Sequence, residues 1–239
     1  MESSGSEAPD EEHPLVHSSA VRQPLWQLCC LKIAPIFHDL VRKLKFPVHI
    51  YIPSIIQNFQ SMGRSRYRVY DSAYPYFITS SLVEGYPIFS NPLAAQVVLD
   101  ALNFIQIKRT TVVYAYVIME NHIHMVVQAD KLPQQIQSFK SWTARAIIDL
   151  FSVNGHFFQL SKLRKAKNPA HQDSVHQLWQ EGFYPKQIFS DKMMIQKIEY
   201  IHNNPVKRGF VDRPEDWRYS SARNYLGMEA LIPVTLFEL

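Results

Sequence analysis

The chain has 239 residues, of which 46% are hydrophobic, so it can bury one sizeable core. Its two cysteines, Cys29 and Cys30, are adjacent and cannot form a disulfide framework, which favours a reduced, cytoplasmic setting. The net charge is +4, but residues 1–12 hold five acidic residues and no basic one, so the remainder is clearly basic, as is typical of proteins that bind polyanions.

The N-terminal part differs in composition from the rest. Residues 1–20 lack any hydrophobic period, and 21–61 are apolar but interrupted by four prolines. The acidic start does not fit a signal peptide, and the longest apolar run near it is too short to cross a bilayer, so we expect a soluble protein. We predict a disordered or atypical extension over 1–61, one domain over 62–228, and a C-terminal tail over 229–239.

Periodicity and turn residues predict the elements of that domain. Strands are indicated where β-branched and aromatic residues gather, and helices where apolar residues recur at helical spacing after Asn91-Pro92, Pro133 and Ser190. In chain order we predict a strand at 76–82, a helix through 105, a central strand at 110–119, a strand through 128, a helix at 133–151, a basic loop at 154–176, a strand within 178–188 and a last helix at 191–204. This order predicts an α+β fold of ferredoxin-like plan, with an antiparallel sheet covered by helices on one face.

Two histidines lie in the strand that ends at residue 128. Because side chains alternate along a strand, His122 and His124 share one face, while Ile123, Met125 and Val127 share the other. Two such imidazoles can hold one metal ion. Taken alone, however, the pair favours an ordinary strand, since a chain with ten histidines contains such a pair by chance.

The last predicted helix carries a second polar set. Its buried stripe is Met194, Ile198 and Ile201, while Tyr200 and Asn204 stand one turn apart on a different face. Considered separately, Tyr200 is an ordinary amphipathic tyrosine and Asn204 an ordinary helix terminator before a proline.

Four segments in order carry a family resemblance. They are VIMENHIHMVV, FKSWTARAI, LWQEGFYPKQI and IEYIHNNPVKRGFVDRPEDWRYSSARNYLG. Together they resemble the REP-associated tyrosine transposases, of the insertion-sequence-200-like branch of the His-hydrophobic-His (HUH) single-strand nucleases, over residues 62–228. A lone His-x-His is weak evidence, but the order of these segments is specific. Glu120 replaces the proline common in the family, and Pro185 stands where an acidic or amide residue is usual.

The resemblance implies a set of site residues. His122, His124 and Asn204 would be metal ligands and Tyr200 the nucleophile. The implied ion is Mg²⁺ or Mn²⁺, although mixed nitrogen and oxygen ligands are more typical of Mn²⁺ or Zn²⁺.

The leading functional hypothesis is a DNA transposase, a metal-dependent endonuclease that nicks and rejoins single-stranded DNA through a 5′-phosphotyrosine, at hairpin-forming repeats. Trp142, Trp179 and Tyr184 can stack unpaired bases, with a core role as the alternative for each. We expect single-stranded or hairpin DNA as the partner and leave monomer or dimer open. The residues expected to hold DNA phosphates are Lys140, Arg145, Lys162, Arg164, Lys165, Lys207 and Arg208.

Two alternatives belong to other classes. The first is a decayed or domesticated protein that binds DNA hairpins without cutting them. The second is a metal-dependent phosphodiesterase that uses water, which would form no covalent protein–DNA adduct and would need further acidic ligands.

Overall fold

The computed structural model describes residues 71–170 and 174–238. The predicted extension over 1–61 and the boundary at residue 62 therefore lie outside the described residues. Within the described ranges, no helix combines the length and apolar character that a membrane crossing requires.

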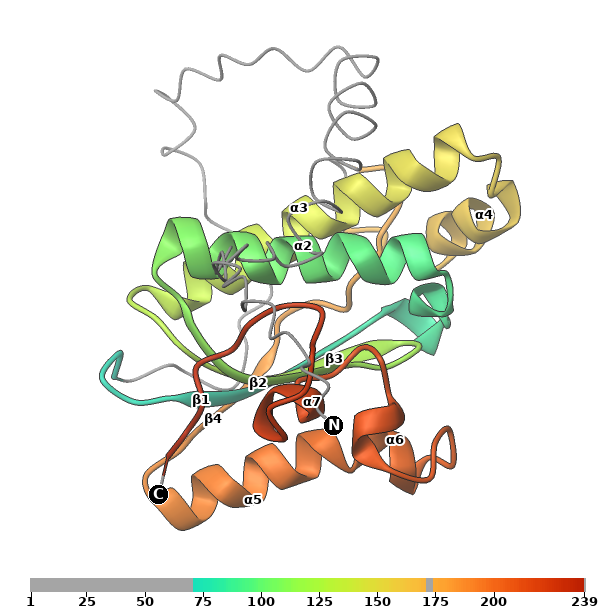
Figure 1. Ribbon diagram of the computed structural model, residues 1–239. Coiled ribbons are helices and arrows are strands. Elements are labelled where there is room, and N and C mark those ends of the chain that lie inside the picture. Colours follow the sequence, from blue (N-terminus) through green and yellow to red (C-terminus); the bar gives the residue numbers. More distant parts are fainter. Residues whose placement is uncertain (1–70, 171–173, 239) are drawn as a thin grey trace, which may run out of the picture. The chain divides into compact units, whose positions relative to one another are not determined.

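The centre of the domain is a four-stranded sheet in the order β2-β3-β1-β4, with every neighbouring pair antiparallel (Figure 1). Its strands are β1 (Tyr76–Ser81), β2 (Val112–Ile118), β3 (His122–Gln128) and β4 (Tyr184–Gln187). The predicted α+β fold, a ferredoxin-like antiparallel sheet with helices packed on it, is confirmed.

Two long helices cover one face of this sheet. Helix α2 (Pro92–Arg109) begins as predicted, because the Asn91 side chain accepts hydrogen bonds from the Leu93 and Ala94 amides. Helix α3 (Leu132–Val153) follows β3. Short 3-10 turns at 83–85 and 88–90 lead into α2.

Part of the predicted basic loop is a helix, α4 (Phe157–Lys165). Leu160 and Leu163 are buried at helical spacing, but lysine and arginine neighbours mask this short pattern in the sequence.

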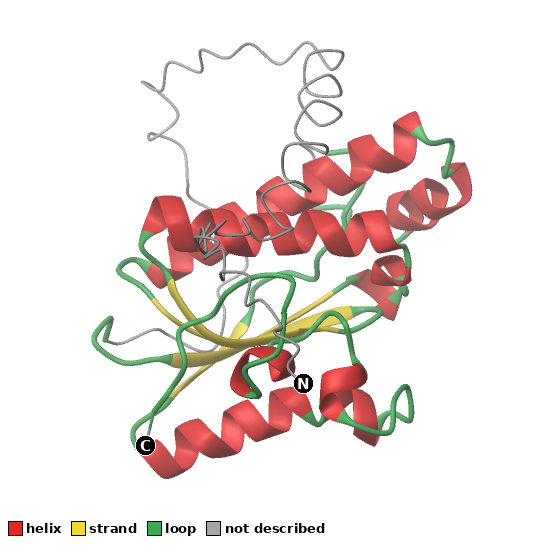
Figure 2. Cartoon of the chain, viewed as in Figure 1, coloured by secondary structure: helices red, strands yellow, loops and turns green. Residues whose placement is uncertain are grey.

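Helices pack on both faces of the sheet, so the prediction of one covered face is wrong (Figure 2). Helix α5 (Asp191–His202) covers the second face with the predicted stripe of Met194, Ile198 and Ile201, which packs with Phe77 and Val126. The histidine side of β3 faces this second core. Helix α5 is also not the last one, since α6 (Asn204–Lys207), η3 (Pro214–Asp216) and α7 (Ala222–Tyr225) follow it.

Strand β2 was predicted to be central but lies at the edge of the sheet. Apolar side chains lie on both faces of β2 because helices cover both faces of the sheet. Its outer edge is bound by later segments: Ser221 donates to the Tyr116 carbonyl at 3.0 Å, and Thr235 donates to the Val113 carbonyl at 2.9 Å. The last residues, predicted as a tail, thus lie along β2, with Ile232 buried.

Helix α5 is attached to the sheet at both ends. Residues 188–190 form the whole connection from β4, and the Ser190 side chain accepts from the Met193 amide as the predicted N-cap. After α6, the chain returns to β2 and forms an isolated bridge between Ser220 and Val117.

Candidate functional site

His122 and His124 stand side by side on the sheet face that α5 covers. Their ring centroids are 4.7 Å apart with an interplanar angle of 74°. His124 is buried, with 6% of its surface exposed, and His122 is partly buried. The alternation of side chains along the strand therefore produces the predicted pair.

Hydrogen bonds hold both rings in place. His122 Nδ1 lies 2.6 Å from Asn121 Oδ1, and because an amide oxygen only accepts, this nitrogen carries the proton. The Asn121 amide is itself oriented by donating to the Gly85 carbonyl at 3.2 Å. His122 Nε2 therefore keeps the lone pair that a metal ion needs. His124 Nδ1 lies 2.8 Å from Thr79 Oγ1 on the neighbouring strand.

Both histidines are neutral at pH 7. Burial lowers the pKa of His124 to about 3, with further lowering from the charge that His122 takes up when it is protonated and from the charge of Arg208. Burial also lowers the pKa of His122, and this effect outweighs the opposite effect of Glu120. Neutral imidazoles are the form that binds metal ions.

Tyr200 comes to the histidines from α5. Its ring centroid is 5.4 Å from that of His124 and 5.8 Å from that of Phe77, and both ring pairs are T-shaped. Two ammonium groups lie close to the Tyr200 ring, Lys207 Nζ at 5.5 Å and Lys197 Nζ at 6.0 Å. Tyr200 is 39% exposed, so a substrate can reach it.

Asn204 begins α6, one helical turn after Tyr200, and is 8% exposed. Its Oδ1 is buried without any hydrogen-bond partner, which is unusual because leaving such a group unpaired costs about 1–3 kcal/mol. An amide oxygen kept in this state is suited to bind a cation. Among the described residues no three His, Cys, Asp or Glu side chains gather into a group that could hold a metal ion.

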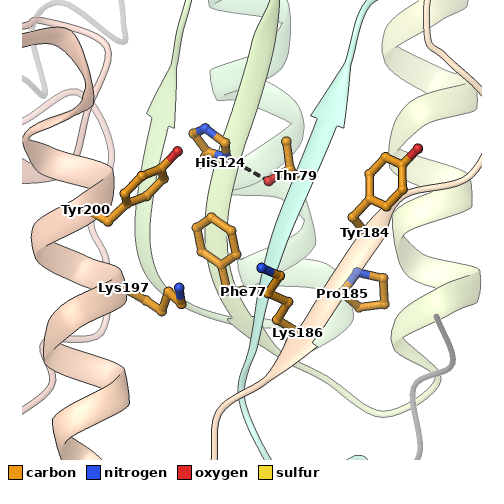
Figure 3. A pocket seen from close by; sticks show the side chains of 8 residues that line it. All are labelled: Phe77, Thr79, His124, Tyr184, Pro185, Lys186, Lys197 and Tyr200. Atoms are coloured by element: carbon orange, nitrogen blue, oxygen red, sulfur yellow. Dashed lines mark hydrogen bonds between the residues drawn. The ribbon is translucent and has the colours of Figure 1, made fainter. Parts of the chain in front are cut away.

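A cavity of about 420 Å³ opens beside His124 and Tyr200 (Figure 3). Its floor is formed by Phe77 and Thr79 of β1 with His124 of β3. Tyr200 and Lys197 line it from α5, and the remaining lining residues, Tyr184, Pro185 and Lys186, come from β4.

The structure brings only two of the predicted phosphate-binding residues to this face. Lys207 lies beside Tyr200, and Arg208 follows it but forms an ion pair with Glu120. The other five belong to α3 and α4, on the helical layer of the opposite core, and are Lys140, Arg145, Lys162, Arg164 and Lys165.

Two residues predicted to contact DNA, one lysine and one tryptophan, form hydrogen bonds within the protein. The Lys140 ammonium donates to the carbonyls of Gln180 and Gly182, and burial lowers its pKa to about 8. Trp179 is buried in the first core and its indole donates to Thr143 Oγ1 at 3.0 Å, so a base-stacking role for Trp179 is wrong. Trp142 and Tyr184 are exposed.

Sequence reasoning missed Thr79, Asn121 and the Glu120–Arg208 pair. Asn121 could have been found, since a polar side chain directly before a predicted ligand can support it. Thr79 had no such signal, because its contact with His124 depends on the register between β1 and β3.

Comparison with known proteins gives a sequence relative over part of the chain. No family model matches the chain. A protein of Haemophilus influenzae named "Putative REP-associated tyrosine transposase" is 32% identical over 108 residues, which make up 45% of this chain and 56% of that protein. The chain thus spans little more than half the length of this relative.

Two solved structures are similar in fold. A REP-associated tyrosine transposase bound to a REP hairpin has a TM-score of 0.50 and 21% identity, and the match covers 73% of this chain and 95% of that one. A structure described as "a putative transposase from deinococcus radiodurans r1" has 20% identity over 59% of this chain and 97% of that one, and its TM-score of 0.35 is too low to assign a fold. The first match, together with the sequence relative, confirms the resemblance of this chain to the REP-associated tyrosine transposases.

Proposed function

We propose that this protein is a DNA transposase that nicks and rejoins single-stranded DNA through Tyr200, at hairpin-forming repeats. The observation that carries the proposal is the meeting of a phenol, two neutral imidazoles and lysine charges on one face of the sheet. The transposase relative and the hairpin-bound structural neighbour support the choice of substrate class.

The site residues fit a divalent metal ion. His122 and His124 would hold it through their second ring nitrogens, and the unpaired Asn204 oxygen would be a third ligand. Mg²⁺ or Mn²⁺ held there would polarise the scissile phosphate, and since all three ligands are neutral, the full positive charge would act on the phosphate oxygens. The mixed nitrogen and oxygen set favours Mn²⁺ over Mg²⁺.

Tyr200 would act as the nucleophile on phosphorus. As its Oη–P bond forms, the phenol loses its proton, the bond from phosphorus to the 3′ oxygen breaks, and that oxygen takes up a proton. The products are a 5′-phosphotyrosine and a free 3′-hydroxyl. Because the phosphodiester energy stays in the covalent link, a later 3′-hydroxyl can attack it and restore both the strand and the phenol. Lys197 and Lys207 would offset the phosphate charge next to the ring.

The alternatives lack support of their own. A water-using phosphodiesterase would need acidic ligands, and no such cluster exists among the described residues. A decayed binding protein would be expected to have lost part of the site, yet Tyr200, both histidines and Asn204 are all present.

Tyr200→Phe tests the mechanism because it removes one oxygen and keeps the ring. Hairpin DNA with single-stranded flanks, labelled at its 3′ end, is incubated with protein and Mg²⁺ or Mn²⁺ and separated on a denaturing gel. We expect wild type to carry the label as a covalent adduct, and the variant to form none while binding the same DNA equally well. Tyr74→Phe is the matched control, because Tyr74 is exposed outside the cavity lining.

Two results would contradict the proposal. Cleavage by Tyr200→Phe at nearly the wild-type rate would favour the phosphodiesterase. A wild-type protein that binds hairpins but forms no adduct with either metal would favour the binding protein.

A further inference from the structure

A bulge directly precedes β4, the strand whose side chains line one wall of the cavity. The ladder between β1 and β4 ends at Tyr184, and the next bridge to β1 is at Trp179. Between these two pairs, β1 contributes residues 80–81 and the other segment contributes 180–183. The longer segment must therefore bulge, and bulges beside active sites often set the direction of neighbouring side chains. Residues 180–183 are called the bulge below.

The bulge lies next to the two rows of the sheet that contain the histidines. At one end, the Gln180 amide donates to the Ser81 carbonyl at 2.9 Å, and Ser81 pairs in register with His122. At the other end, Tyr184 belongs to the same row as His124, with one residue of β1 between them. A change in the shape of the bulge would therefore move the cavity wall relative to both histidines.

Lys140 of α3 contacts the bulge through two hydrogen bonds. Its ammonium donates to the Gln180 carbonyl at 2.6 Å and to the Gly182 carbonyl. Gly182 has a φ of 67°, a left-handed conformation that glycine adopts without strain. Hydrogen bonds from an ammonium group are charge-assisted and stronger than those between neutral groups. The same Nζ lies 6.0 Å from the centre of the Trp179 ring, so Lys140 contacts both the bulge and the residue before it.

The charge of Lys140 is costly to keep in this place. Burial lowers the pKa of Lys140 to about 8, and the charge of Glu181, within the bulge, opposes this effect. An apolar side chain would fill the same space without the cost of removing a charge from water. Packing alone therefore does not require an ammonium group here, whereas binding two carbonyls of the bulge does.

We propose that Lys140 is a positioning residue, whose ammonium fixes the shape of the bulge and thereby holds the β4 wall of the cavity in place beside the histidine pair. The inference rests on the proposed function, since the wall borders the place where Tyr200 would attack DNA. It assigns Lys140 a role other than the phosphate contact expected from the sequence.

Hydrogen exchange measured by mass spectrometry tests the contact without DNA. In Lys140→Met, the peptide over 178–188 should exchange about tenfold faster than in wild type, because the charge-assisted bonds are lost. Peptides from α5 and the melting temperature should stay as in wild type. Lys192→Met is the matched control and should exchange as wild type does, because Lys192 is exposed near the start of α5 and outside the cavity lining.

A pH series separates the charge of Lys140 from the bulk of its side chain. After correction for the intrinsic exchange rate at each pH, wild-type protection over 178–188 should fall as the pH rises through about 8, where Lys140 loses its proton. Lys140→Met should show no such fall. Lys140→Arg keeps its charge and several donors, so it should restore protection and retain it up to about pH 9.

Adduct formation and DNA binding test the positioning role. At saturating hairpin DNA, Lys140→Met should form the covalent adduct about tenfold more slowly or worse, because a small displacement near the reacting groups slows the chemical step. Lys140→Arg should recover most of this rate. The slope of log affinity against log salt should be the same in wild type and Lys140→Met, since the proposed role includes no phosphate contact.

Each remaining outcome would contradict the inference. Unchanged exchange over 178–188 in Lys140→Met, or faster exchange throughout the protein, would overturn the contact as the support of the bulge. Faster exchange confined to the bulge with a wild-type rate of adduct formation, or a lower salt slope, would overturn the positioning role. If wild type forms no adduct, the cleavage proposal fails, and the exchange measurements still decide whether Lys140 fixes the bulge.

Discussion

Asn204 combines a burial cost with a proposed binding role. Its Oδ1 is buried and unpaired, so a side chain without that oxygen should not weaken the fold. We predict that Asn204→Leu leaves the free energy of unfolding unchanged or raises it by about 1 kcal/mol. The variant should, however, lose the rise in melting temperature that Mn²⁺ gives the wild type, because a bound ligand stabilises only the protein that holds it.

Asn203→Ala serves as the control for this experiment. Its amide donates to the Glu199 carbonyl within α5, and the variant should keep the Mn²⁺-dependent rise. A full Mn²⁺ response in Asn204→Leu would mean that the amide is not a ligand.

A buried histidine near the end of α5 should make the fold sensitive to acid. His202 Nε2 lies 2.9 Å from Ser221 Oγ, and burial lowers the pKa of His202 to about 4. An unfolded chain takes up this proton near pH 6.5, so acid favours the unfolded state, and the stability present above pH 6.5 falls as the pH drops towards 4. We predict a loss of roughly 2 kcal/mol from this group between pH 6.5 and pH 5.

Urea unfolding of wild type and His202→Gln at several pH values measures this loss. The glutamine variant cannot take up the proton, so its stability should fall less steeply over the same range. Parallel curves for the two proteins would show that His202 does not contribute.

At the level of single residues, spacing predicted which side chains share a face, and the family resemblance supplied the roles expected of them. Alternation in a strand placed His122 with His124, and the helical repeat placed Tyr200 one turn before Asn204. Lys140 shows the limit of this reasoning, because a sequence displays its charge but not the Gln180 and Gly182 carbonyls that bind it. A hydrogen-bond partner from a distant segment of the chain cannot be predicted from the residues next to Lys140.

An ion pair links the two elements that carry the candidate metal ligands. Glu120 precedes β3 by two residues and pairs with Arg208, which follows α6 and lies four residues after Asn204. The Glu120 side chain is 19% exposed and that of Arg208 43% exposed. We infer that this pair sets the distance between His122 and Asn204.

Charge reversal tests this link. Glu120→Arg and Arg208→Glu, made singly, should each reduce cleavage at least tenfold and destabilise the fold by about 1 kcal/mol, because each places like charges in contact. The double variant restores opposite charges and should recover most of both losses. If cleavage stays as low in the double variant as in the single ones, Arg208 acts on DNA directly and the link is not needed.

Elements were predicted more reliably than their neighbours in space. The strands and the long helices follow from local periodicity, and the order of elements followed from them. The predicted central position of β2 was wrong. Apolar side chains on both faces of a strand show that both faces of the sheet are covered, but they do not show whether another strand lies beside it. Its outer edge is bound by Ser221 and Thr235, which lie more than a hundred residues further along the chain.

At the scale of the whole molecule, the attachment of α5 at both ends decides how many chains one reaction needs. The short connection over 188–190 and the return of the chain to β2 at Ser220 keep Tyr200 above the histidines of its own sheet. Each molecule should then be catalytically self-sufficient, and adduct formed per molecule should not depend on protein concentration. Mixing His124→Ala with Tyr200→Phe should restore no adduct, whereas recovery of activity in the mixture would mean that two chains exchange this helix.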